Sequence, residues 1–348
     1  MVRRLLVTFA VLPVALVLAE GVVRALDVKP RPIEALPSGM YRLSENPVLG
    51  FEYLPSRGAG QGEGPNWSIN SHGFREREFS VQKAPGTYRI VAIGDSTTAG
   101  LLVRDTSKVF TRVLEEQLNA EAAQGRRFEV LNLGVGGYHT VQEAELLRTR
   151  ALQLEPDLVL VTVCLNDFHA GSDGGLMTRL RRRNRMAADP GPGLYRALVR
   201  HSRLAFVLHH RLGLQLTEDE RERWYEREVL AGASPVRLGF ERIAALRERH
   251  GFELLTVVLP HFSSPFSAYE YAGIHADVRA AAEGLELELV DLLESFQSVA
   301  DDASGFGIDR VHLSVEGHAV MARILMGLLR ERPGMPLRAP RVEASSRE

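Results

Sequence analysis

The sequence predicts an α/β fold with a mostly parallel, five-stranded sheet and a helical insertion. From residue 88 onward, short apolar runs alternate with stretches of helical periodicity, which is typical of βαβ units. Hydrophobic residues make up 45% of the chain and charged residues 25%, which is ordinary for a globular protein with one sizeable core. The strands are expected at 89–93, 128–133, 158–163, 254–259 and 287–290.

Helices between these strands are expected to cover the sheet. The helix after the first strand places its apolar side chains on one face, at Val109, Phe110, Val113, Leu114 and Leu118. The next helix opens with Thr140 and Glu143 at the spacing of a capping box. Near the end of the chain, Ser314 can cap an apolar helix over 315–329.

Residues 1–26 are predicted to be a signal anchor or a signal peptide. Arg3 and Arg4 precede an apolar run over 5–19, which is the pattern of an exported protein. The residues at 17–19 could serve as a cleavage site, but the apolar pattern continues beyond them, which favours an uncleaved membrane anchor. The body of the protein is therefore expected outside the cytoplasm, either periplasmic and anchored in the inner membrane or, after cleavage, secreted.

Three further regions differ in composition from the alternating part of the chain. Residues 27–86 are rich in Pro and Gly and are expected to form an extended arm over a main domain at 87–330. Within that domain, about 168–235 interrupts the alternation after the end of a strand, so it is either a lid or cap over a ligand site or a solvated helical excursion. Residues 331–348 are expected to be a disordered tail.

Charge and cysteine content exclude several functional classes. The net charge of -2 comes from 42 basic and 44 acidic residues, so no overall field favours nucleic acid as a partner, and small or neutral substrates fit better. The single cysteine, Cys164, excludes an internal disulfide and a cysteine-built metal site. His209, His210 and His261 form no helix-spaced pair with a nearby acidic partner, so no zinc site is expected. No cofactor is implied.

Two candidate elements of a catalytic site follow the first two strands. Ser96 lies in a Gly-Asp-Ser turn directly after the first strand, where its hydroxyl could reach the carboxyl edge of the sheet, although such turns are also ordinary helix caps. The glycine-rich segment over 132–138 follows the second strand and is either a tight turn or a place where backbone N–H groups approach a ligand. A dinucleotide fingerprint is excluded because its third glycine would fall at His139.

Two more elements complete the set. Asn166 and Asp167 follow the third strand and would bring polar side chains to the same edge, although an asparagine in a turn is more often structural. Asp309 and His312 are spaced so that the carboxylate could orient the imidazole, although both could instead be cap residues before the last helix. The four elements together favour nucleophilic catalysis, because each lies at a strand end or a helix start.

This ordered set resembles the GDSL or SGNH hydrolase family over about 88–330, excluding the insertion. The resemblance implies a three-layer α/β/α sandwich and a catalytic triad of Ser96 as nucleophile, His312 as general base and Asp309 as its orienting acid. It also implies an oxyanion hole formed by the backbone N–H groups of Ser96 and Gly137 and the side chain of Asn166. Asp95 and Asp167 are the supporting acids of these motifs.

The N-terminal segment and an upstream pattern, Asn70, Gly73 and Arg75, look like a membrane-anchored bacterial subset of that family. Two positions depart from the family pattern: Cys164 stands where a glycine is usual, and Leu313 follows the histidine where proline is common. Neither removes a reacting group, and Cys164 is interpreted as structural.

The expected activity is hydrolysis of acyl or acetyl esters on cell-envelope substrates, either small molecules or glycans, through an acyl-Ser96 intermediate. Two alternatives remain open from the sequence. One is an acyltransferase that uses the same triad and a glycan hydroxyl in place of water. The other is a catalytically silent module that binds an envelope polysaccharide.

Overall fold

The computed structural model describes residues 2–26, 40–46, 48–56, 68–165, 167, 201–205, 208, 235–262 and 265–338. A five-stranded sheet in the order β4-β3-β5-β6-β7 lies at its centre, and every neighbouring pair of strands is parallel. The strands are β3 (Thr87–Ile93), β4 (Arg127–Asn132), β5 (Leu158–Val163), β6 (Glu253–Val258) and β7 (Leu289–Asp291). The predicted α/β fold is confirmed, and each strand differs from its expected bounds by at most about two residues at either end.

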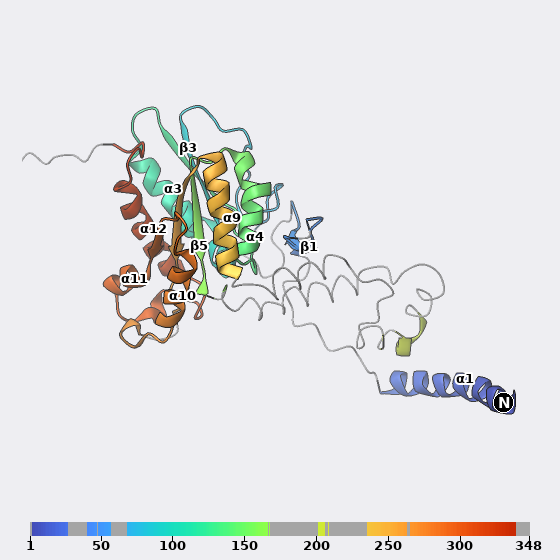
Figure 1. Cartoon of the computed structure of the whole chain (residues 1–348). Helices are drawn as coiled ribbons and strands as arrows, with labels where there is room; N and C mark the ends of the chain where they lie inside the picture. Colours follow the sequence, from blue (N-terminus) through green and yellow to red (C-terminus); the bar gives the residue numbers. More distant parts are fainter. Residues whose placement is uncertain are drawn as a thin grey trace, which may run out of the picture.

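Helices cover both faces of this sheet, which makes three layers (Figure 1). One face packs against α4 (Thr140–Thr149), α9 (Pro235–His250) and α10 (Ala272–Ala282). The other packs against α3 (Phe110–Ala120), α11 (Leu293–Val299) and α12 (Val315–Arg330). Successive strand side chains point to opposite faces, so Val91 and Ile93 enter the first core while Ile90 and Ala92 enter the second.

Shorter elements join these layers. They are α2 (Ser96–Ala99) and the 3₁₀ helices η1 (Thr106–Lys108), η2 (Ala151–Leu154), η5 (Phe266–Ala268) and η6 (Ala303–Gly305). At the start of α12 the hydroxyl of Ser314 accepts a hydrogen bond from the N–H of Gly317 at 3.0 Å, so the predicted cap is confirmed.

The cap predicted for α4 is wrong by one residue. The N-cap is His139, and the capping box pairs it with Gln142 rather than pairing Thr140 with Glu143. Thr140 is already helical, and its hydroxyl donates instead to the carboxylate of Asp167 at 2.7 Å. Because the Thr140 hydroxyl makes this tertiary contact, it does not act as the helix cap that its spacing from Glu143 predicted.

The arm packs against the start of α4. Its strands β1 (Tyr41–Leu43) and β2 (Phe51–Tyr53) form an antiparallel hairpin. The hydroxyl of Tyr138 donates to the carbonyl of Phe51 at 2.6 Å, and the side-chain amide of Gln142 donates to the carbonyl of Leu49 at 2.8 Å. The described part of the arm is therefore fixed to the domain by specific hydrogen bonds.

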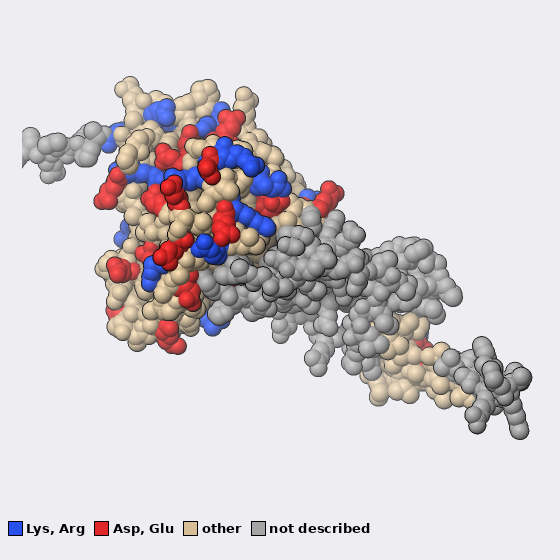
Figure 2. All heavy atoms as spheres, in the orientation of Figure 1, with Lys and Arg blue, Asp and Glu red and all other residues tan. Residues whose placement is uncertain are grey.

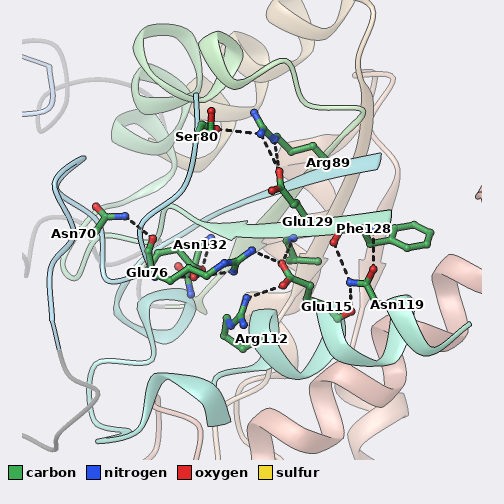
Figure 3. A network of polar contacts seen from close by, with 12 residues as sticks. Asn70, Glu76, Ser80, Arg89, Arg112, Glu115, Asn119, Phe128, Glu129 and Asn132 are labelled. Atoms are coloured by element: carbon green, nitrogen blue, oxygen red, sulfur yellow. Dashed lines mark hydrogen bonds and ion pairs between the residues drawn. The ribbon is translucent and has the colours of Figure 1, made fainter. Parts of the chain in front are cut away.

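A buried polar network ties the later part of the arm to β4 and α3 (Figure 3). The carboxylate of Glu76 accepts a hydrogen bond from the backbone N–H of Asn132 at 3.1 Å. Arg77 forms ion pairs with Glu76 at 3.2 Å and with Glu115 at 2.8 Å, and Arg112 pairs with Glu115 at 2.7 Å. Burial raises the pKa of Glu76. The nearby arginine charges and hydrogen bonds lower this pKa and so partly offset the increase.

The first helix, α1 (Val2–Ala25), contacts a segment far along the sequence. The carboxylate of Glu20 accepts hydrogen bonds from the N–H groups of Arg203 at 2.8 Å and Leu204 at 2.7 Å, and Arg24 donates to the carbonyl of His201 at 2.9 Å. By length and hydropathy, none of the helices in the described ranges could cross a membrane.

The chain still contacts the sheet beyond the predicted domain boundary at residue 330. Arg332 forms ion pairs with Glu253 at 2.9 Å and with Glu288 at 2.8 Å. Leu337 makes an antiparallel bridge with Ala122. Residues 339–348 of the predicted tail lie outside the described part of the chain, as does most of the predicted insertion.

Acidic and basic side chains are interspersed on the face of the domain shown in Figure 2. On α9, for example, Arg237 pairs with Glu241 at 3.0 Å, one helical turn away. Neighbouring charges of opposite sign partly cancel, so this face projects a weaker field than a patch of one sign would.

The buried histidine of α12 should make stability depend on pH. His318 accepts a hydrogen bond from the N–H of Phe110 at 3.3 Å, and burial, with a smaller effect from the charges of Arg75 and His312, lowers its pKa to about 3. Between pH 6.5 and 3 the unfolded chain binds a proton at this residue and the folded chain does not, so its contribution to stability falls as the pH falls. The loss should reach about 2 kcal/mol at pH 5.

His318→Asn keeps a side-chain acceptor and removes the titrating ring. Urea unfolding measures the free energy of unfolding at pH 7 and at pH 5. Between these two pH values we expect the wild type to lose about 2 kcal/mol more of this free energy than the variant does. His250→Asn, at the exposed end of α9, serves as the matched control and should follow the wild type. Equal pH dependence of wild type and His318→Asn would contradict the expectation.

Candidate active site

The turn after β3 presents Ser96 at the carboxyl edge of the sheet. β3 ends at Ile93, and α2 begins at Ser96. Between them, Asp95 caps the helix: its carboxylate accepts a hydrogen bond from the N–H of Thr97 at 2.8 Å. This local cap fixes the backbone that carries the serine hydroxyl.

The hydroxyl of Ser96 lies beside the imidazole of His312. The distance from Ser96 Oγ to His312 Nε2 is 2.9 Å, whereas the distance to the nearest carboxylate oxygen of Asp95 is 3.5 Å. The hydroxyl therefore has its better acceptor in the histidine. On the other side of the ring, Nδ1 lies 2.8 Å from the carboxylate of Asp309.

A short antiparallel bridge holds this histidine and aspartate in a closed loop. The N–H of Ile308 donates to the carbonyl of His312, and the N–H of Ser314 donates to the carbonyl of Phe306, both at 2.8 Å. The bridge pairs Gly307 with Leu313. Since its hydrogen bonds come from the neighbours of Leu313, it does not require an N–H at that position, which explains how leucine and proline can both occupy it.

Hydrogen bonds also orient the carboxylate of Asp309. It accepts from the backbone N–H groups of Val311 and His312, each at 2.8 Å, in addition to the imidazole. Partial burial would raise the pKa of Asp309, but these hydrogen bonds outweigh it and lower the pKa below its usual value. The carboxylate therefore stays ionised and accepts the Nδ1 proton, so Nε2 of His312 presents its lone pair to Ser96.

The glycine-rich segment forms a turn next to Ser96. The N–H of Tyr138 donates to the carbonyl of Val135 at 3.0 Å, and Gly137, the third residue of this turn, has a φ of 85°. These values describe a type II turn, whose third position favours glycine because φ is positive. The N–H of Val135 donates to the carbonyl of Gly94 at 3.0 Å, which fixes the turn against the segment that carries Ser96.

Two backbone N–H groups are available at this edge. Among the residues that the structure describes, those of Ser96 and Gly137 have no hydrogen-bond acceptor. They belong to adjoining turns, so both could donate to an oxygen atom that becomes negatively charged. Asn166, the third predicted donor, lies outside the described residues.

The segment after β5 contacts α2 and the start of α4. Asp167 is buried, donates its N–H to the carbonyl of Cys164 at 3.0 Å and binds the Thr140 hydroxyl at the start of α4. Cys164 is also buried, and the hydroxyl of Thr97 contacts its sulfur at 4.0 Å. The cysteine thus occupies a packing position under the serine turn, with a neighbouring threonine as its partner.

Arg75 supports α2, the helix that begins at Ser96, in a way that the sequence did not predict. Its guanidinium is buried and donates to the carbonyls of Ala99 at 2.8 Å and Gly100 at 2.6 Å, and also to that of Val103. These carbonyls lie at the end of α2 and just beyond it, where helical partners are missing. The signal that could have indicated this role was the Asn70, Gly73 and Arg75 pattern.

Residues that follow β6 also contact the loop that carries Asp309. The N–H of Phe262 donates to the carbonyl of Arg310 at 2.7 Å. The preceding residue, His261, donates its N–H to the hydroxyl of Tyr269 at 2.9 Å, and that hydroxyl lies 2.8 Å from the ring of His275. His261 is therefore part of the support for this loop.

The other two histidines considered for metal binding, His209 and His210, lie outside the described residues. Within the described ranges, no group of three or more His, Cys, Asp or Glu side chains is arranged to hold a metal ion.

Comparison with known proteins gives matches to one family and to several solved structures. Residues 92–320 match the model of the GDSL-like Lipase/Acylhydrolase family. No curated protein matches the chain. Similar structures include the acetyl xylan esterase AlAXEase, with 14% identity, a TM-score of 0.42 and coverage of 69% of this chain and 98% of that one.

Two further structures show comparable similarity. The lipase/acylhydrolase from Enterococcus faecalis has 18% identity, a TM-score of 0.40 and coverage of 69% of this chain and 96% of that one. The acetylxylan esterase Axe2 from Geobacillus stearothermophilus has 15% identity, a TM-score of 0.41 and coverage of 72% and 97%. The family match extends over more than half of the sequence and includes the turn of Ser96 and the loop of Asp309 and His312. The chain therefore belongs to the GDSL-like lipase/acylhydrolase family.

Proposed function

We propose that this protein is a serine esterase that forms an acyl intermediate on Ser96. The observation that carries the proposal is the 2.9 Å contact between Ser96 Oγ and His312 Nε2, together with the 2.8 Å contact between His312 Nδ1 and Asp309. A serine hydroxyl becomes a nucleophile when a positioned base removes its proton, and that base must be in the correct tautomer.

Acylation follows from these contacts. His312 takes the proton of Ser96 as Oγ attacks the ester carbonyl carbon, and Asp309 stabilises the imidazolium that forms. The carbonyl oxygen becomes an oxyanion, and the N–H groups of Ser96 and Gly137 donate hydrogen bonds to it. The C–O bond to the alcohol then breaks, and His312 returns the proton to the departing alkoxide.

Deacylation uses the same groups with water as the attacking molecule. His312 removes a proton from water, the hydroxide adds to the acyl carbon, and the free acid leaves as Ser96 regains its proton. The side chains of His312 and Asp309 are 25% and 47% exposed, so bulk water reaches the base. This accessibility favours hydrolysis over transfer to a second alcohol. The substrate is proposed to be an acyl or acetyl ester of a small molecule or a glycan.

We also propose that the domain acts outside the cytoplasm, at the cell envelope. Arg3 and Arg4 before an apolar run support export, and the apolar side chains of Leu16, Val17 and Leu18 on α1 are more than half exposed. An alkaline phosphatase fused to the end of the chain should be active in cells, because it requires export. An inactive phosphatase fusion beside an active β-galactosidase fusion would contradict this location.

A fluorophosphonate probe tests the nucleophile directly. The full chain should be labelled, and Ser96→Ala should abolish both labelling and the release of free acid from p-nitrophenyl acetate. Ser298→Ala, which changes an exposed serine on α11, is the matched control and should retain both. Labelling that persists in Ser96→Ala, or a folded wild type that is never labelled, would refute the proposal. Comparison of acetate with octanoate esters then measures the preferred acyl length.

Asp309→Asn tests the role of the carboxylate. An asparagine amide can donate to Nδ1, which favours the wrong tautomer of His312, so kcat should fall about 10²- to 10⁴-fold. Asp302→Asn is the control, because Asp302 is an exposed aspartate that accepts a hydrogen bond from the N–H of Ser304 at 2.9 Å. Steady-state kinetics should show this loss of kcat in Asp309→Asn and a kcat close to that of the wild type in Asp302→Asn. Equal activity of the two would show that Asp309 does not orient the base.

A further inference from the structure

Tyr53, in the N-terminal arm, contacts the turn that carries Gly137. Its hydroxyl accepts a hydrogen bond from the backbone N–H of Gly136 at 2.8 Å, and its side chain is fully buried. The family match begins at residue 92, so Tyr53 lies outside the part of the chain that the family describes. A residue of the arm therefore binds the backbone of the proposed oxyanion hole.

The position of this hydrogen bond in the turn gives it a specific effect. Gly136 and Gly137 are the two central residues of the type II turn, and the peptide between them carries the N–H of Gly137. Tyr53 holds the N–H of the preceding peptide, so it limits rotation of the turn at the first of these residues. A Cβ atom on Gly136 would lie 3.4 Å from the Tyr53 hydroxyl and 2.7 Å from that of Tyr41, which shows how closely the arm packs here.

Tyr53 is itself held in one place. Its ring stacks on Tyr41 with centroids 4.9 Å apart. Tyr41 also packs edge to face on Phe51, with centroids 5.5 Å apart. Burial raises the pKa of Tyr53 to about 12, so its hydroxyl stays neutral. The acceptor offered to Gly136 is thus fixed by stacking and keeps its protonation state.

We propose that Tyr53 is a positioning residue for the oxyanion turn, which makes the N-terminal arm a functional part of the active site. The inference rests on the proposed function, since it assigns the role of donor to Gly137. Tyr53 does not touch the substrate; it acts by holding the peptide that precedes the donor. Its loss should affect the transition state, in which the oxyanion forms, more than binding of the ester.

The expected size of the effect lies below that of deleting a donor. Removing one oxyanion-hole donor costs about 10²- to 10³-fold in kcat, and misplacement of a catalytic group by about 1 Å can cost about 10²-fold. Tyr53→Phe keeps the ring and removes only the acceptor. We expect kcat to fall about 10- to 100-fold, while KM changes by less than about threefold.

The test compares three phenylalanine variants of the full chain. Tyr53→Phe removes the acceptor, Tyr41→Phe removes the neighbouring hydroxyl and keeps the stacked ring, and Tyr88→Phe is the matched control. Tyr88 is a buried tyrosine at the amino end of β3, and its hydroxyl contacts Glu253 at 3.4 Å. For each variant, kcat and KM for p-nitrophenyl acetate, the rate constant of fluorophosphonate labelling and the melting temperature are measured.

The inference predicts a graded loss of kcat and of the labelling rate: largest in Tyr53→Phe, smaller in Tyr41→Phe and absent in Tyr88→Phe. If the wild type is active and Tyr53→Phe keeps its kcat, the inference about Tyr53 is overturned while the proposed function stands. A loss of kcat that follows the melting temperature equally in Tyr53→Phe and Tyr88→Phe also overturns the inference, because that result indicates a purely structural role. If the wild type neither hydrolyses the ester nor is labelled, the proposed function is overturned, and the inference that rests on it falls as well.

Discussion

The contact between Ser96 and His312 joins residues 216 positions apart, and the rest of the fold serves to fix its two ends. Ser96 begins a four-residue helix that could not persist alone, because an isolated turn of helix is unstable in water. It is stable here because β3 before it is buried along its whole length and the guanidinium of Arg75 binds the carbonyls that follow it. His312 depends in the same way on α12, whose apolar side packs into the core.

The proposed oxyanion hole consists of backbone groups rather than reactive side chains. Backbone donors are only as well placed as the turns that carry them, so their positions must be set by neighbours. At the turn of Gly137 these neighbours come from three places: Gly94 from the nucleophile segment, Asn132 from β4 and Tyr53 from the arm. The arm thus supplies polar contacts to a site whose proposed reacting side chains all come from the main domain.

The sequence predicted the parts of this structure that leave local signals. A buried parallel strand is a continuous apolar run, and 158–163 coincides with β5 for that reason. The structure also brings together Ser96, Asp309 and His312, each of which lies beside a strand end or a helix start. Tyr53 and Glu76 could not be found this way, because their partners are backbone N–H groups, which every residue except proline possesses. The cap of α4 was misplaced because the Thr140 hydroxyl binds Asp167, a contact between residues 27 positions apart.

Three acids near the proposed oxyanion hole are buried and close enough to affect one another electrostatically. Asp95, Glu143 and Asp167 are all buried, and three full negative charges there would oppose the charge that develops on the substrate oxygen. Burial, followed by the charges of Asp167 and Asp95, raises the pKa of Glu143 well above its usual value. Glu143 therefore favours its neutral form, while Asp95 and Asp167 have hydrogen-bond donors in Thr97 and Thr140. A neutral Glu143 adds no further negative charge to those of Asp95 and Asp167 near the two turns.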